Sequence, residues 1–183
     1  TVVLSKLSPA AASLYVGTKF ARQSLELSPE DQQLQAPVAA MSLASEYDSG
    51  REKPLATGPG SAHDLALIVG ADVISHALSL SLENTNADAA ISTLQVLGQI
   101  ATKNQIYKTA SQQSPITAAL TYPDLQVQFA AAQTILQLDP DRPFRGSSRV
   151  VSILSRVLND SGSPRAVAVH GNPTRATNAA ARS

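Results

Sequence analysis

The chain has 183 residues, of which 43% are apolar, so it is long enough for one folded domain or a short array of repeats. Fourteen basic and fourteen acidic residues give a formal net charge of zero, which argues against a nucleic-acid-binding protein. Aromatic residues make up only 4% of the chain and tryptophan is absent, so alanine and leucine must fill most of the core. Small core side chains predict closely spaced helices.

The sequence contains no cysteine, which excludes disulfides, zinc–cysteine sites and thiol nucleophiles. No apolar run approaches the roughly 20 residues of a membrane span, and the first residues lack the order of a signal peptide. We therefore expect a soluble protein that binds neither nucleic acid nor membrane, with the cytoplasm as the default compartment. Because the chain starts without methionine and stops within an expected helix, we also expect a fragment of a longer protein.

Residues 1–47 are predicted to form a hairpin of two helices. Apolar residues recur at helical spacing between Ala10 and Leu27, and the segment "LSPED" then ends one helix and starts another. We expect Ser28 to cap the second helix and Pro29 to occupy its first position. The segment "FARQSLELSPEDQQLQAPVAAMSLASE" resembles the second half of a tetratricopeptide repeat followed by the next helix. The residues that carry this resemblance are Ala21, Ser24, Leu25 and Pro29.

Residues 48–61 contain three glycines and two prolines without apolar periodicity, which predicts a linker. The helical pattern returns at Ala62 and then repeats. The segment that starts at residue 86 aligns with the segment that starts 38 residues later, at residue 124. In this alignment Ile91 matches Phe129. A third copy begins on the same spacing with Leu154 and Leu158.

This period lies near the roughly 40 to 47 residues of HEAT and armadillo repeats. The stretch "SPITAALTYPDLQVQFAAAQTIL" resembles one HEAT repeat, and with the "DPDRPF" loop that follows it resembles HEAT-type helical proteins of certain bacteria. The resemblance implies HEAT-like helical repeats over residues 62–161 and, for the chain, an all-α fold of the right-handed α–α superhelix (solenoid) type. Three small residues should let the second helix of one repeat approach its neighbours closely: Ala130, Ala131 and Ala132.

Residues 162–183 break the repeat. The β-branched run 167–169 predicts a short strand, and a helix is expected to start at Pro173, so this segment reads as the first strand and helix of a truncated α/β unit. It resembles the opening of a response-regulator receiver domain. Receivers place acidic residues after this strand, where this chain has His170, Gly171 and Asn172, so the resemblance implies a degenerate receiver.

No catalytic constellation, cofactor motif or metal-ligand spacing is recognisable, and we expect no enzyme activity, no cofactor and no metal. His63 and His76 have no second ligand at helical spacing, so exposed or capping roles are expected for both. His170 is expected to be an ordinary loop residue. In the loop 138–149 the clustered aspartates and arginines either pair locally, with Phe144 packed between helices, or contact an anion or partner; local pairing is favoured.

These features predict a non-catalytic scaffold that binds a protein partner, or another domain of its own chain, through stacked second helices. The alternative is the helical docking or input part of a regulatory signalling protein that continues into the receiver-like domain. An enzyme assembled from residues distant in sequence is a third possibility. Neutral glutamines on the second helices suit recognition by hydrogen bonds. The candidate contact residues are Gln95, Gln99, Gln126, Gln128, Gln133, Gln137, Arg142 and Arg145.

Overall fold

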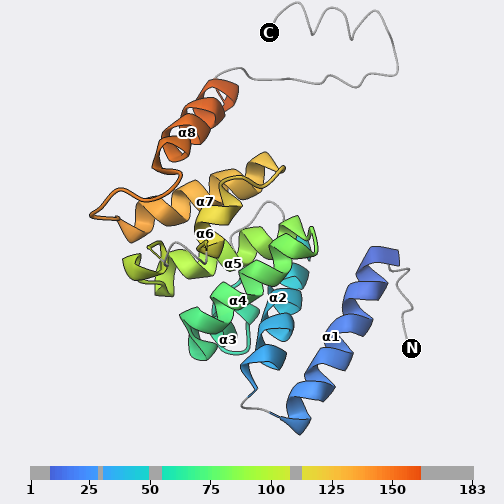
Figure 1. Ribbon diagram of the computed structural model, residues 1–183. Coiled ribbons are helices and arrows are strands. Elements are labelled where there is room, and N and C mark those ends of the chain that lie inside the picture. Colours follow the sequence, from blue (N-terminus) through green and yellow to red (C-terminus); the bar gives the residue numbers. More distant parts are fainter. Residues whose placement is uncertain (1–8, 29–30, 50–54, 108–112, 162–183) are drawn as a thin grey trace, which may run out of the picture.

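The computed structural model describes residues 9–28, 31–49, 55–107 and 113–161, and all regular structure within them is helical (Figure 1). The elements are α1 Pro9–Leu27, α2 Gln32–Ser49, α3 Ala62–Val69, α4 Ala71–Glu83, α5 Ala87–Ile100, the 3₁₀ helix η1 Lys103–Gln105, α6 Pro115–Ala119, α7 Leu125–Leu138 and α8 Ser147–Ser161. The prediction of an all-α protein is confirmed for these residues. The α/β unit expected in 162–183, with its receiver-like strand and His170, lies outside the described residues.

The helices form two layers. In the first layer α2 packs on α5, α5 packs on α7, and α7 packs on α8 (Figure 1). In the second layer α4 covers α2 and α5 and also contacts α6, which covers α7. The short helix α3 lies against α2, α4 and α5, and α1 packs on α2. The first layer is therefore a row of four helices that follow one another in space.

Helix α5 lies at the centre of the core. Eight of its 14 residues are buried, among them Leu94 and Leu97, because it meets α2, α4 and α7 on different sides. Its buried hydroxyls are satisfied within the helix: Ser92 Oγ donates to the Asp88 carbonyl at 2.8 Å, and Thr93 Oγ1 donates to the Ala89 carbonyl at 2.7 Å. The helix thus buries polar side chains without leaving their hydroxyls unpaired.

Small residues bring α5 and α7 close together. A Cβ atom at Gly98 would lie 3.8 Å from the Cα of Thr134 on α7. Thr134 Oγ1 donates to the Leu94 carbonyl across the interface at 2.8 Å. On α7 the three alanines expected to allow a close approach are all buried: Ala130, Ala131 and Ala132.

We expect Gly98→Ala to raise the free energy of unfolding by about 0.5–1 kcal/mol, because alanine has the higher helix propensity. The new Cβ would overlap only the end of the exposed Gln137 side chain, which can turn away, and would meet Thr134 Cα at ordinary contact distance. Urea unfolding followed by circular dichroism measures the change. A loss of stability would mean that Gln137 cannot move. Gly98→Leu, which reaches the α7 backbone, is expected to destabilise the protein.

The start of α2 differs from the expected one. The helix begins at Gln32, and Asp31 Oδ1 accepts a hydrogen bond from the Gln33 amide at 2.8 Å. The prediction that Ser28 caps this helix and that Pro29 opens it is therefore wrong. The physical reason is that the carboxylate of Asp31 satisfies a free amide in the first turn of the helix, that of Gln33, which is the function expected of Ser28.

The segment 48–61, expected to be a linker, belongs partly to the core. α2 extends to Ser49, Leu55 is buried, and Ser61 Oγ caps α3 by accepting from the Asp64 amide at 3.1 Å. Since α2 packs on α4 and α5, the core continues from the first hairpin into the later helices. Within the segment 48–61, the structure describes residues 48–49 and 55–61.

Gly70 separates α3 from α4. Its φ of 89° is a left-handed value that favours glycine, and the two helices meet at a bend of 117°. No single helix of the described residues is long and apolar enough to cross a membrane. α3 and α4 reach the length and hydropathy of a membrane span only when they are taken together across their bend.

Candidate binding groove

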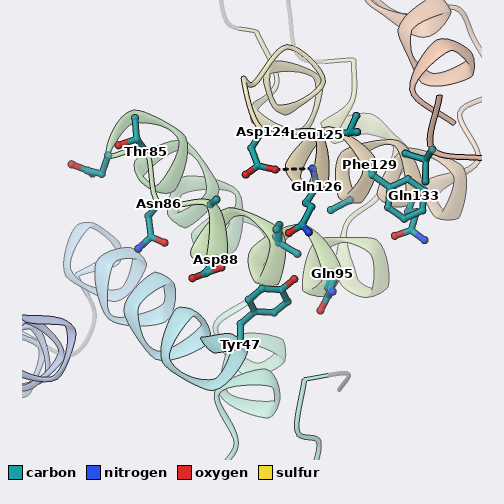
Figure 2. A pocket seen from close by; sticks show the side chains of 15 residues that line it. Tyr47, Thr85, Asn86, Asp88, Gln95, Asp124, Leu125, Gln126, Phe129 and Gln133 are labelled. Carbon is teal, nitrogen blue, oxygen red and sulfur yellow. Dashed lines mark hydrogen bonds between the residues drawn. The ribbon is translucent and has the colours of Figure 1, made fainter. Parts of the chain in front are cut away.

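A groove of about 1180 Å³ crosses the row of helices α2, α5, α7 and α8 (Figure 2). The first halves of α5 and α7, with the turn 84–86 before α5, form most of its lining. α2 contributes Tyr47, and α8 contributes Val157. The groove therefore uses all four helices of the first layer.

The starts of α5 and α7 are built alike at this groove. Asn86 Oδ1 accepts from the Ala89 amide at 3.1 Å, and Asp124 Oδ1 accepts from the Gln126 amide at 2.7 Å. Both caps are side-chain oxygens on residues with extended backbone, and each helix has 14 residues. The groove is consequently bordered by two helix starts with one amide of each already satisfied.

The groove combines an apolar floor with a polar rim. Ile91 and Ala130 are buried, and Phe129 is half-buried beside them. Exposed amide side chains line the groove on both helices: Gln95, Gln126 and Gln133. Because an amide side chain both donates and accepts hydrogen bonds, such a rim can pair with the backbone of a bound peptide. The ionisable carboxylates of the lining are Asp88 and Asp124, and it contains no lysine or arginine.

The predicted glutamines separate into two sets. Gln95, Gln126 and Gln133 line the groove, whereas Gln99, Gln128 and Gln137 do not. Gln99 and Gln137 each follow a groove residue by one helical turn, which takes them past its edge. Gln99 Oε1 lies 3.1 Å from His63 Nε2, and Gln137 lies against Gly98. Gln128 Nε2 donates to the Tyr122 carbonyl, and Gln128 lines a smaller cleft.

Arg142 is held within the loop after α7. Its guanidinium lies over the Tyr107 ring, 4.4 Å from the centroid, and its Nε is 3.8 Å from Asp141 Oδ1. Lys103 Nζ lies 2.9 Å from the other oxygen, Asp141 Oδ2. The hydrogen bond from Lys103, with a further one from Tyr107, holds the pKa of Asp141 below its usual value, and the same contact raises the pKa of Lys103. This loop is thereby tied to η1.

The prediction of local pairing in this loop is confirmed for Asp141 and Arg142. Phe144 is partly buried and packs against the core, as expected. Arg145 is exposed beside Gly146 and is not part of the groove lining. Neither candidate arginine therefore belongs to the groove.

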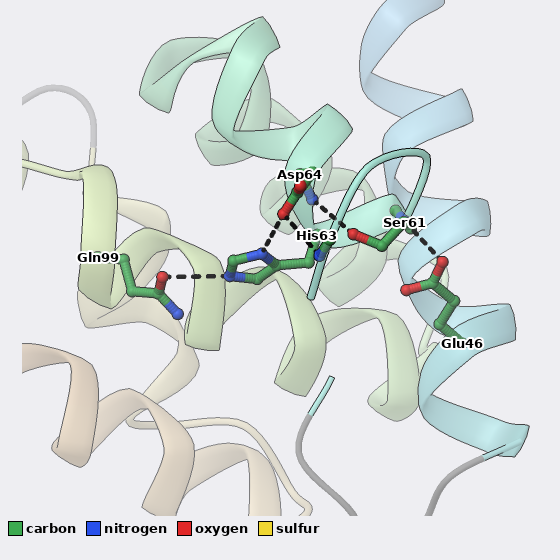
Figure 3. Close-up of polar contacts among 7 residues, drawn as sticks. Glu46, Ser61, His63, Asp64 and Gln99 are labelled. Carbon is green, nitrogen blue, oxygen red and sulfur yellow. Dashed lines mark hydrogen bonds and ion pairs between the residues drawn. The ribbon is translucent and has the colours of Figure 1, made fainter. Parts of the chain in front are cut away.

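His63 is buried, with 5% of its surface exposed, so the expectation of an exposed or capping residue is wrong (Figure 3). Its Nδ1 lies 3.3 Å from Asp64 Oδ1, and its Nε2 faces Gln99 on α5. The hydrogen bond with His63 lowers the pKa of Asp64, and a second one from the Gly58 amide lowers it further. His63 thus joins α3 to α5, while His76 is exposed.

Ser61, His63 and Asp64 lie near one another without the geometry of a nucleophilic relay. Ser61 Oγ accepts from the Asp64 backbone amide, and the ring nitrogens of His63 are engaged by Asp64 and Gln99. Among the residues that the structure describes, no group of three or more histidine, aspartate or glutamate side chains is placed to hold a metal ion.

Twelve of the fifteen groove residues were not among the sequence-based candidates, and they include Tyr47, Asp88, Asp124 and Phe129. Asp124 carried a usable signal, since it precedes an apolar helical pattern at a proline-containing turn. Asp88 lies in the first turn of α5, and α5 is the helix that aligns with α7 in the repeat, so both carboxylates lie near a helix start. Tyr47 and Phe129 had apolar character only, and their position at the groove depends on how the helices pack.

Comparison of the chain with models of known protein families, with curated proteins and with solved structures finds no match.

Proposed function

We propose that this chain is a non-catalytic scaffold that binds a segment of a partner protein, or of another domain of its own chain, in the groove across α2, α5, α7 and α8. The groove is the observation that carries the proposal. Packed helices lie about 8–10 Å apart, so a row of four spans roughly 25–30 Å. At about 3.3 Å per residue, this length suits an extended segment of eight or nine residues.

The spacing of the helices supports a repeated architecture. α5 and α7 have equal lengths and start 38 residues apart, at residues 87 and 125. α8 starts 76 residues after α4, which is twice that period. We propose that these elements are HEAT-like repeats of a right-handed solenoid that follows a tetratricopeptide-like hairpin, α1 and α2. Arrays of this kind offer extended concave surfaces to their ligands.

The chemistry of the groove indicates its ligand. Two carboxylates, Asp88 and Asp124, stand among neutral amides, so a segment with a lysine or arginine side chain matches the charge of the lining. Phe129 offers an aromatic surface beside them. The signalling alternative depends on a receiver-like domain that begins in residues 162–183, and no observation in the described residues favours it over the scaffold.

A pair of double variants tests the groove. Gln95→Arg with Gln133→Arg places two large cations in the groove, where they should block a basic segment. Gln99→Arg with Gln137→Arg places the same groups on the same two helices outside it. We expect the groove pair to weaken partner retention by about tenfold or more, equivalent to about 1.4 kcal/mol. The control pair should bind normally.

The measurement is quantitative affinity capture from a lysate of the source organism, with unchanged helical circular dichroism required of both double variants. If the groove pair retains partner as well as the original chain does, the groove is not the binding surface. Equal losses in both pairs would show that the effect comes from general positive charge and would also contradict the proposal.

A further inference from the structure

We infer that a second cleft, between α6, α7 and α8, binds a glutamate or aspartate side chain of the partner protein. The cleft has a volume of about 170 Å³ and is lined by Leu120, Gln128, Arg149, Ser152, Ile153 and Arg156. A water molecule occupies about 30 Å³ of liquid, so this is room for one side-chain head group and not for a helix. The inference rests on the proposed function because the partner protein supplies the carboxylate, but the cleft is separate from the groove.

Two arginines supply the positive charge. Arg149 and Arg156 lie seven residues apart on α8, which places them on one face and roughly 10 Å apart along the helix axis. Ser152 lies between them, three residues from one and four from the other, so all three are neighbours on the helix surface. Within the described part of the chain, neither guanidinium has an ion-pair or hydrogen-bond partner. Both can therefore donate to a carboxylate, for which the planar guanidinium is well suited.

No negative charge on the neighbouring helices competes for these arginines. The sequences of α6 and α7 contain no ionisable residue at all, and the lining of the cleft includes no aspartate or glutamate. The sequence of α8 itself holds two arginines, Arg149 and Arg156, and one acidic residue, Asp160, which follows Arg156 by four residues. A carboxylate that enters the cleft therefore meets attraction from both arginines and no acidic side chain in the lining.

The floor of the cleft favours a protein side chain as the source of the carboxylate. Leu120 is 1% exposed and Ile153 is 6% exposed, so the cleft has an apolar base beneath its charged rim. A glutamate side chain has methylene groups for such a base and a carboxylate for the rim, whereas inorganic phosphate has no apolar part. Gln128 donates to the Tyr122 carbonyl through Nε2, and its second amide hydrogen is a further donor at the rim.

The two sites have opposite charges. The groove carries Asp88 and Asp124, and the cleft carries Arg149 and Arg156. α8 contributes to both, with Val157 in the groove and Arg156 in the cleft. A partner segment with basic and acidic side chains would match both sites.

Nuclear magnetic resonance titration of the full chain tests the cleft without knowledge of the partner. The probes are the blocked tripeptide Ala-Glu-Ala, its Ala-Gln-Ala counterpart and inorganic phosphate. We expect the glutamate peptide to shift the side-chain Nε–H signals of Arg149 and Arg156 and the backbone amides of α8. The shifts should saturate at millimolar peptide and weaken as salt is added.

The double variant Arg149→Gln with Arg156→Gln should lose most or all of the shifts of the α8 backbone amides. The double variant Arg142→Gln with Arg145→Gln, whose changes lie outside the cleft, should keep them. Equal shifts with the glutamine peptide, retention of the response in the cleft variant, or binding of phosphate alone would each overturn the inference. These titrations do not involve the groove, so their outcome is independent of the groove test. The cleft can bind the glutamate peptide even if the groove variants retain the partner, and the groove variants can lose the partner even if the cleft binds no peptide.

Discussion

Leu97→Ala is expected to lower the free energy of unfolding by about 2–5 kcal/mol, because it leaves a cavity at the centre of the fold. The side chain is fully buried on α5, which contacts α2, α3, α4 and α7. A small domain has only about 5–15 kcal/mol of stability in total, so this loss is a large share. Urea unfolding followed by circular dichroism measures it.

Leu136→Ala is the matched control, because Leu136 lies on the adjacent helix α7 and is 56% exposed. Its removal should change the free energy of unfolding by no more than about 0.5 kcal/mol. If both variants lose the same small amount, α5 is not the central helix of the core.

Ala131→Leu is expected to lower the free energy of unfolding by about 1–3 kcal/mol through overpacking. Ala131 is fully buried on α7 and lies three residues before Thr134, whose hydroxyl donates to the Leu94 carbonyl of α5. A leucine there must push helices apart or adopt a strained rotamer. The measurement is again urea unfolding, compared with Gln133→Leu, which adds a leucine to an exposed position of the same helix.

A stability for Ala131→Leu equal to that of the exposed control would mean that the spacing between α5 and α7 is not set by small side chains. Gly98→Ala on the facing helix is expected to act in the opposite direction. The pair of results would therefore distinguish a packed interface from a general tolerance of larger residues.

Helix positions followed from the sequence where apolar periodicity and a capping residue agreed. The two aligned segments that start at residues 86 and 124 contain α5 and α7, and each helix begins one residue after its segment does. The reason is that Asn86 and Asp124 are good caps that directly precede an apolar pattern. At the start of α2 two residues competed for the same role, and Asp31 and not Ser28 accepts the amide. Such a choice depends on local geometry that periodicity does not determine.

The candidate site was predictable only in part. Helical spacing indicated that the glutamines of α5 and α7 are exposed, but the edge of the groove between Gln95 and Gln99 depends on where neighbouring helices overlap. The burial of His63 was equally hidden, since its partner Gln99 lies 36 residues away in the chain. Both features come from the packing of helices that are distant in sequence.

The hydrogen bond from Thr134 to the Leu94 carbonyl fixes the register of α5 against α7. A slide by one turn would break this bond and move the small residues of one helix away from Gly98 on the other. The backbones of the groove walls are therefore held in one register, so Gln95 and Gln133 project from fixed positions on α5 and α7. A ligand that docks there meets a rigid template, so little of its binding free energy is lost in ordering the protein.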